Sequence, residues 1–244
     1  MIITIDGPAG SGKTSVARSL AKRLSIRVLQ SGLMYRAAAV LLLERHRIIE
    51  LRDLDSDAAV IDSAVCHQLK DSLSADDISS LDGIEYGYEN DSQIPFVKIA
   101  GENILRLLNK FVVGLPASII SQNPQVRAWA VDLQRQVAQK YSVVAEGRDC
   151  GTVVFPQADF KFFLTASLAV RQSRVVCDSS RGIMQGQVAG IEQSIIQRDA
   201  HDQTRSIAPL TAPQDSIIVD TSAMSLGEVI EFLLGLIFEK RRNR

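Results

Sequence analysis

Short apolar runs alternate along the chain with longer segments whose apolar positions recur at helical spacing. The first run, 2–6, is followed by a glycine, and residues 12–24 then place Val16, Leu20 and Leu24 on one helical face. The pattern repeats with expected strands and helices: strands at 27–29, 142–145, 160–164 and 217–220, and helices at 33–45 and 225–239. Strands that alternate with helices of this length predict an α/β fold with a five-stranded parallel sheet flanked by helices.

Residues 48–115 interrupt this alternation. Over 50–95 the chain has twelve acidic and two basic residues, a difference of −10. We interpret the segment as an inserted subdomain, helical at first and then partly β around 94–99. Its acidic residues lack the D-x-D-x-D-G spacing of a calcium loop, so we interpret them as a solvated surface. A second irregular region, 178–190, is rich in serine and glycine and is expected to be a mobile loop or lid.

The composition is that of a globular protein without a strong charge excess. The 244 residues fit one large domain, or one core with an insertion. A net charge of −1 argues against a general nucleic-acid-binding protein, and no apolar run approaches the roughly 18 residues of a membrane span. The three cysteines are widely spaced, and the chain opens on a strand-like run without a basic leader segment. We therefore expect a reduced, cytoplasmic protein.

The most specific motif follows the first expected strand. It reads Gly7-Pro8-Ala9-Gly10-Ser11-Gly12-Lys13-Thr14 and fits G-x-x-x-x-G-K-[ST]. Its glycines allow the backbone to wrap around an anion, and the N-terminus of the next helix adds the positive end of its dipole. Lys13 can reach the β- and γ-phosphates of a nucleotide, and Thr14 can hold Mg²⁺. We call residues 7–14 the phosphate loop, and it predicts a nucleoside triphosphate ligand for a kinase, a GTPase or a motor.

Other features separate these three classes. The segment Asn109-Lys110-Phe111-Val112 lacks the Asp of a guanine-reading N-K-x-D motif, which argues against a GTPase. The run Val143-Val144-Ala145-Glu146 could pass for the acidic strand end of a motor ATPase. Arginines, however, recur in compact polar clusters, at 31–36, 146–149, 171–174 and 198–205. Arginine binds phosphate bidentately, so these clusters favour phosphoryl transfer between two phosphate-bearing substrates.

At these clusters the sequence resembles the bacterial cytidylate (CMP/dCMP) kinases over nearly its whole length. The most specific segments are 7–15, 31–36, 198–210 and 147–156, the last of which reads GRDCGTVVFP. The resemblance implies a P-loop kinase core with an inserted subdomain for a nucleoside monophosphate (NMP) and a small lid. The parts would be a core at about 1–36, 118–166 and 205–244, an NMP-binding insertion at about 37–117 and a lid at about 167–204.

For the ATP site, the resemblance implies that nine consecutive residues bind the phosphates: Gly7, Pro8, Ala9, Gly10, Ser11, Gly12, Lys13, Thr14 and Ser15. Thr14 would also hold Mg²⁺. Four cations would be catalytic and act on the transferring phosphoryl group: Lys13, Arg148, Arg171 and Arg174. Phosphoryl transfer passes through a loose transition state, so such a site needs positioning and charge neutralisation rather than a general base.

For the acceptor site, the resemblance implies ten binding residues: Ser31, Tyr35, Arg36, Ser118, Arg127, Arg148, Asp149, Arg198, Asp202 and Arg205. Ser118, Arg127 and Asp149 would read cytosine, while Arg198 and Asp202 would lie near the acceptor sugar. An Asp can accept from the amino group of cytosine, and Arg or Ser can donate to its ring nitrogen and carbonyl. Uracil presents the opposite edge, so buried groups would be left unpaired against it.

The expected reaction is therefore transfer of the γ-phosphoryl group of ATP to CMP or dCMP with Mg²⁺. We expect a monomer that binds these small molecules and neither nucleic acid nor membrane. One alternative is another kinase on the same core, of UMP/CMP or shikimate type. A second is a nucleotide-binding regulatory protein with little turnover, because the arginine usual in the family is missing at 107–110 and the lid has few basic residues. Gln30 also stands where an acidic residue is usual.

Overall fold

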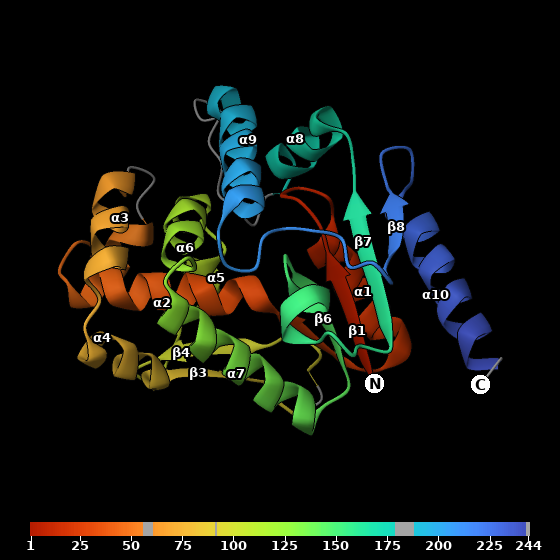
Figure 1. The fold of residues 1–244 in the computed structure, drawn as a ribbon, viewed down its shortest axis with the longest axis horizontal. Coiled ribbons are helices and arrows are strands. Elements are labelled where there is room, and N and C mark those ends of the chain that lie inside the picture. The colour runs from red at the N-terminus through yellow and green to blue at the C-terminus, as the bar shows by residue number, and fades with distance from the viewer. Residues whose placement is uncertain (56–60, 91, 179–187, 243–244) are drawn as a thin grey trace.

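Five parallel strands form the central sheet of the computed structural model, which describes residues 1–55, 61–90, 92–178 and 188–242 (Figure 1). Their order across the sheet is β2 (Arg27–Gln30), β6 (Val143–Gly147), β1 (Ile2–Asp6), β7 (Phe160–Thr165) and β8 (Ile217–Asp220). All neighbouring strands run parallel, so their carboxyl ends share one end of the sheet. The expected strands are confirmed, with ends shifted by at most two residues.

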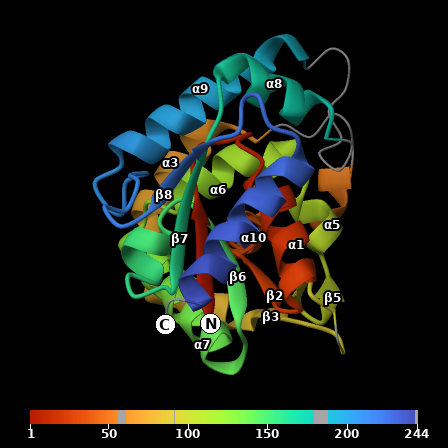
Figure 2. The same ribbon diagram turned by 90° about the vertical axis from the view of Figure 1, so that its right-hand side faces the viewer.

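Helices cover both faces of this sheet. On one face, α1 (Lys13–Leu24) and α10 (Leu226–Arg242) lie side by side (Figure 2), and Ile3 and Ile5 of β1 pack into the apolar core that these helices share. On the other face, α2 (Ser31–Arg45) and α7 (Pro124–Lys140) pack on Val143 and Ala145 of β6. Successive side chains of a strand point to opposite faces, so the apolar runs of the sequence supply both cores.

The segment between α2 and α7 contains helices first and strands second, as expected. It comprises α3 (Ser63–Ser72), α4 (Ala75–Ser80), β3 (Ile84–Gly87), β4 (Phe96–Ile99), β5 (Glu102–Asn103), α5 (Leu105–Leu108) and α6 (Gly114–Ile120). Single helical turns lie at Leu51–Asp55, Leu81–Gly83 and Phe111–Val113. The three strands form a small antiparallel sheet. Buried side chains of this segment, among them Cys66, Ile104 and Ile119, share one continuous core with α2 and α7.

The expected boundaries of the insertion fall within helices. Residue 36 lies inside α2 and residue 117 inside α6, and neither helix is interrupted there. The division into core, insertion and lid therefore stays a prediction. α2 is one continuous helix that directly follows β2 in the chain. It extends away from the central sheet (Figure 1).

Two helices lie over the carboxyl ends of the strands, α8 (Leu168–Val176) and α9 (Val188–Thr204) (Figures 1 and 2). We call them the lid helices. The loop expected at 178–190 falls largely on residues 179–187, which lie outside the described residues. The lid helices contribute Val175, Ile191 and Ile195 to a small apolar cluster that also contains Ala9. In the part of the chain that the structure describes, no helix is both long and apolar enough to cross a membrane.

Candidate functional site

The phosphate loop lies between β1, the middle strand of the sheet, and the first turn of α1. Gly7, Gly10 and Gly12 have φ angles of 145°, 76° and 89°, which side chains rarely allow. A Cβ atom on Gly7 would lie 2.0 Å from the Leu164 carbonyl oxygen, and one on Gly10 would lie 2.7 Å from that of Arg171. The curl of the backbone therefore favours glycine at all three positions, and close neighbours require it at Gly7 and Gly10 as well.

Lys13 folds back over the loop. Its Nζ donates to the carbonyl oxygen of Pro8 at 2.7 Å and lies 3.4 Å from Ser11 Oγ. Burial, with the positive charge of Arg148 nearby, lowers the pKa of Lys13 well below its ordinary value. Since this buried amine is hydrogen-bonded to neutral oxygens, an anion in the loop would stabilise its charged form. The loop and Lys13 thus fit a phosphate group.

Thr14 faces an acidic residue from the neighbouring strand. Thr14 Oγ1 donates to Glu146 Oε1 at 3.0 Å, and Gln30 Nε2 donates to the same oxygen at 3.2 Å. Arg18 in turn donates to Gln30 Oε1 at 3.4 Å. Hydroxyl and carboxylate oxygens are ligands that Mg²⁺ accepts, so Thr14 and Glu146 fit this ion beside the loop. Among the described residues, no cluster of three His, Cys, Asp or Glu side chains could hold a metal by itself.

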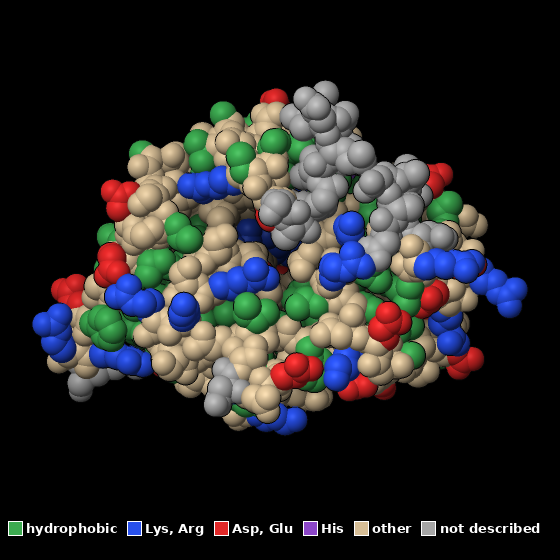
Figure 3. Space-filling model, turned by 180° about the vertical axis from the view of Figure 1, so that it is seen from behind, with side chains coloured by type: hydrophobic (Ala, Val, Ile, Leu, Met, Phe, Trp, Pro, Cys, Tyr) green, Lys and Arg blue, Asp and Glu red, His purple; other side chains and the backbone are tan. Residues whose placement is uncertain are grey.

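A cavity of about 590 Å³ opens beside the phosphate loop. Seen from behind, the molecule is hollowed near the middle of this face, with Lys and Arg side chains visible at depth (Figure 3). Most of the expected site residues line the cavity: Ala9–Ser15, Ser31, Tyr35, Arg36, Ser118, Arg148, Asp149, Arg174, Arg198, Asp202 and Arg205. Gly7, Pro8, Arg127 and Arg171 are not among its lining residues. The volume is in the range of sites for small molecules.

Opposite the loop, arginine and aspartate side chains form a connected cluster. Arg148 Nε donates to Asp202 Oδ2 at 2.7 Å, and Arg205 lies 3.8 Å from Asp202 Oδ1. Arg205 also lies 3.7 Å from Asp149 Oδ1, whose other oxygen accepts from Arg127 Nη1 at 3.0 Å. The cluster joins residues from the end of β6, from α7 and from the end of α9. Arginines therefore outnumber carboxylates here, which suits an anionic ligand.

Arg127 is buried behind Asp149. Its Nη1 also donates to Tyr35 Oη at 3.3 Å, and its guanidinium lies 5.1 Å from the centre of the Tyr35 ring. Burial raises the pKa of Tyr35 above its ordinary value, so this hydroxyl stays protonated. Within the described part of the chain, Nε and Nη2 of Arg127 are buried without a hydrogen-bond partner. Arg127 does not line the cavity itself, so these two donors lie beside a lining residue, Asp149. Buried donors without a partner fit a ligand that brings acceptors to them.

Arg36 is held by the segment 107–110, where the resemblance led us to expect an arginine. Its Nη1 donates to the carbonyl oxygens of Leu108 at 2.6 Å and Lys110 at 3.1 Å. A Cβ atom on Gly114 would lie 3.4 Å from Arg36 Nη2 and 3.3 Å from Arg198 Nη1. The segment thus contributes two carbonyl groups rather than a cation, and two guanidinium groups converge beside Gly114.

The two expected lid arginines on α8 are placed differently. Arg174 lines the cavity and donates to Thr221, to Oγ1 at 2.9 Å and to the carbonyl oxygen at 2.8 Å. Arg171 lies against the outer side of the phosphate loop, where it donates to the Ala9 carbonyl oxygen at 2.9 Å and pairs with Asp199. Of the four expected catalytic cations, Lys13, Arg148 and Arg174 therefore border the cavity and Arg171 does not.

The predicted binding and catalytic residues did not include Gly114, Glu146, Asp199 and Thr221, although Glu146 ends the run 143–146 that could pass for an acidic strand end. Glu146 and Thr221 follow a general rule, since each lies at or just after the carboxyl end of a parallel strand, where ligands bind. Asp199 lies next to the predicted Arg198, but only its contacts in the fold distinguish it from a surface acid. No feature of the sequence marked Gly114.

Comparisons with known proteins give one consistent result. A family model described as cytidylate kinase matches residues 3–239. The chain is similar to the cytidylate kinase of Carboxydothermus hydrogenoformans, with 36% identity over 240 residues and 98% of each chain covered. It is also similar to that of Thermotoga maritima, with 34% identity over 238 residues and 98% and 97% of the two chains covered. The cytidylate kinase of Caldanaerobacter subterraneus subsp. tengcongensis is 35% identical over 229 residues, which cover 94% of this chain and 91% of the relative.

Proposed function

The chain belongs to the cytidylate kinase family, and we propose how its residues divide the work of transferring the γ-phosphoryl group of ATP to CMP or dCMP. The products are ADP and CDP or dCDP. The observation that supports this division most is that one cavity is bordered by the phosphate loop on one side and by the arginine–aspartate cluster on the other. Donor and acceptor phosphates can therefore meet in a single cavity.

The donor side binds ATP. The backbone N–H groups of the phosphate loop and the ammonium group of Lys13 bind its phosphates, and Arg174 approaches them from α8. Thr14 and Glu146 are the residues that would hold Mg²⁺. When bound, this ion neutralises charge on the β- and γ-phosphates. Gln30 keeps the Glu146 carboxylate turned toward Thr14 through its 3.2 Å hydrogen bond.

The acceptor side binds the monophosphate. Arg36 and Arg198 converge beside Gly114 and bind its phosphate group together with Arg148 and Ser31. Arg205 completes this positive field, while Asp202 holds Arg148 and lies near the sugar. Arginine forks give both charge and direction, which places the acceptor oxygen in line with the γ-phosphorus.

The base is read at the inner end of the cavity. Asp149 accepts from the cytosine amino group, and Arg127 and Ser118 donate to the ring nitrogen and carbonyl. Arg127 lies behind Asp149 in this structure, and its two buried donors without a partner support its part in this set when the base brings acceptors to them. Uracil would place a carbonyl against the Asp149 carboxylate, so we propose selectivity for cytosine.

Catalysis follows from positioning and charge. Lys13, Arg148 and Arg174 surround the transferring phosphoryl group, and the lid helices, part of the proposed lid at 167–204, exclude water when they close. The contacts of Arg171 favour an action through the phosphate loop.

We also propose a monomer, because one chain supplies every residue named here. A cytoplasmic location is proposed because Cys66, Cys150 and Cys177 are free thiols.

The test is a coupled assay of ADP release with ATP, Mg²⁺ and a panel of CMP, dCMP, UMP, AMP and GMP. Lys13→Ala serves as the blank, since it removes the cation that contacts the phosphates. We expect release with CMP or dCMP well above the other acceptors. A higher rate with another acceptor would favour a different kinase of the same core. ADP release equal to the blank, with CMP still bound in calorimetry, would favour a regulatory protein.

A further inference from the structure

Asp199 of α9 contacts the backbone of the phosphate loop. Its Oδ1 accepts the N–H of Ala9 at 3.0 Å, and its Oδ2 accepts from Arg171 of α8. Arg171 also donates to the carbonyl oxygen of Ala9 at 2.9 Å and to that of Ala166 at 3.2 Å. One ion pair, formed between the two lid helices, thus binds both backbone polar groups of a single loop residue.

Apolar and steric contacts reinforce this arrangement. Ala9 packs against Val175 of α8 and against Ile191 and Ile195 of α9. The Arg171 carbonyl oxygen lies so close to Gly10 that a Cβ atom there would be 2.7 Å from it. The outer side of the loop is therefore covered by the lid helices, while its inner side borders the cavity.

Asp199 itself does not line the cavity, whereas its neighbours Arg198 and Asp202 on the same helix do. The side chains of Asp199 and Arg171 are 13% and 12% exposed, so solvent screens their interaction only weakly. A loop with three glycines at positive φ has little rigidity of its own. If contacts from outside the loop already restrain Ala9, phosphate binding has a smaller entropy cost for ordering the loop.

We propose that Asp199 is a positioning residue that, together with Arg171, holds the phosphate loop at Ala9 in the shape that binds the phosphates of ATP. The inference rests on the proposed function only in taking ATP as the ligand of the loop. It gives Arg171 a role through the loop instead of direct contact with the transferring phosphoryl group. The contacts of the lid helices with Ala9 and the order of the loop are then coupled.

The experiment compares Asp199→Asn, Arg171→Gln and the double variant with the wild type. Asparagine keeps an acceptor for the Ala9 N–H but loses the charge that pairs with Arg171. Each variant is assayed for kcat and for KM of ATP and of CMP, and ATP affinity is measured separately by calorimetry without CMP. Glu192→Gln, at an exposed position of the same helix, is the matched control.

Asp199→Asn is expected to weaken ATP binding by about 10- to 100-fold, the range of a lost charged hydrogen bond, with KM for CMP unchanged. Arg171→Gln should weaken ATP binding to a similar extent. The double variant should bind ATP no more weakly than the single variant with the lower ATP affinity. A purely structural loss would instead lower Tm and change both KM values together.

Two outcomes would overturn the proposal. The first is ATP affinity in Asp199→Asn equal to that of Glu192→Gln. The second outcome has two parts: the fold-losses of ATP affinity in the two single variants multiply in the double variant, and Arg171→Gln also lowers kcat. Arg171 would then act on the phosphoryl group itself. If Asp199→Asn does not fold, Arg171→Lys keeps the charge but not the fork, and unchanged ATP affinity there contradicts the proposal. Calorimetry with ATP tests the inference even if CMP proves not to be the acceptor.

Discussion

Arg127 on α7 and Asp149 after β6 form a buried ion pair, with 3.0 Å between Arg127 Nη1 and Asp149 Oδ2. Only Asp149 borders the cavity, while Arg127 lies behind it and also contacts Tyr35. The carboxylate that faces the ligand is therefore oriented by a cation from a different element. Because neither side chain is screened by solvent, the orientation of Asp149 depends strongly on this partner.

Replacing either member of this pair is expected to weaken cytosine recognition. Asp149→Ala removes the acceptor for the amino group, and we expect the Kd of CMP to rise about 100-fold, as for a lost charged hydrogen bond. Arg127→Ala should have a similar effect and also lower the free energy of unfolding by about 3 kcal/mol, because it leaves a carboxylate buried without its main partner. Calorimetry with CMP and with ATP, and urea unfolding, measure these effects.

ATP affinity should not change in either variant, because the phosphate loop lies on the other side of the cavity. Asp132→Ala, an exposed position on the same helix as Arg127, is the control. Unchanged CMP affinity in both variants would remove the pair from the acceptor site.

Gly114→Ala is expected to separate stability from function. Gly114 has φ −67° and ψ −44° at the start of α6, so alanine fits the backbone and should stabilise the helix by up to about 1 kcal/mol. Its Cβ atom, however, would crowd the guanidinium groups of Arg36 and Arg198 at 3.4 and 3.3 Å. We expect KM for CMP to rise about tenfold, the cost of a displaced charged contact, with KM for ATP unchanged.

Gly235→Ala in α10 is the matched control, since a Cβ atom there has no described neighbour within 4 Å. It should raise Tm and leave both KM values as in the wild type. A Gly114→Ala enzyme with normal KM for CMP would show that the two arginines do not need this gap.

The sequence predicted those parts of the site whose residues are neighbours along the chain. The phosphate loop is contiguous, so its glycines and Lys13 could be identified from spacing alone. Asp199 and Ala9 lie 190 positions apart, and no local pattern reports their hydrogen bond. Arg171 and Arg174 look equivalent in sequence, yet Arg174 lines the cavity and donates to Thr221, whereas Arg171 does not line it and donates to Ala9. The strands were predicted because each is an apolar run, whereas their order depends on contacts between distant segments.

Thr14 and Glu146 are expected to set the requirement for Mg²⁺. Glu146→Gln removes the negative charge of a ligand oxygen, and Thr14→Val removes the hydroxyl oxygen. Thr14→Ser keeps the hydroxyl. We expect the Mg²⁺ concentration for half-maximal activity to rise about 10- to 100-fold in the first two variants and little in the third. Calorimetry of ATP binding with and without Mg²⁺ provides a second measurement. Equal Mg²⁺ dependence in all three variants would place the ion elsewhere.

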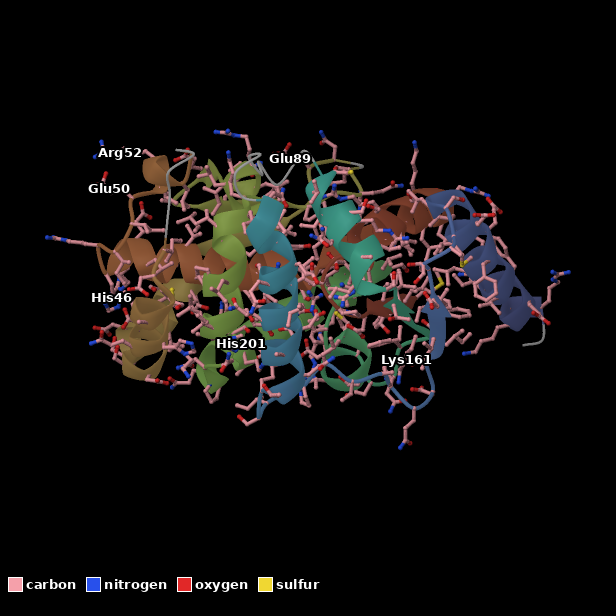
Figure 4. All side chains as sticks on the ribbon, turned by 90° about the horizontal axis from the view of Figure 1, so that it is seen from above. His46, Glu50, Arg52, Glu89, Lys161 and His201 are labelled. Carbon is pink, nitrogen blue, oxygen red and sulfur yellow. The ribbon has the colours of Figure 1, made fainter. Side chains whose placement is uncertain are left out.

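The acidic insertion contains one carboxylate that should shape acid stability. Asp77, at the start of α4, accepts hydrogen bonds from Ser74 and pairs with Arg45 and His46. His46 lies just after α2, at its end far from Lys161 and the sheet (Figure 4). Burial alone would raise the pKa of Asp77, but these hydrogen bonds outweigh it and lower the pKa from 3.8 to about 2.

A carboxyl group with a lowered pKa stabilises the folded protein above its ordinary pKa, and this contribution is lost as pH falls from about 4 to about 2. After allowance for the exposure of Arg45 and His46, we expect Asp77→Asn to lower the free energy of unfolding at pH 6 by about 1–2 kcal/mol. Near pH 2 the variant and the wild type should be equally stable. Asp76→Asn, exposed in the same turn, should follow the wild-type curve of Tm against pH. A parallel downward shift of the Asp77→Asn curve at every pH would show that the residue contributes through packing and not through its charge.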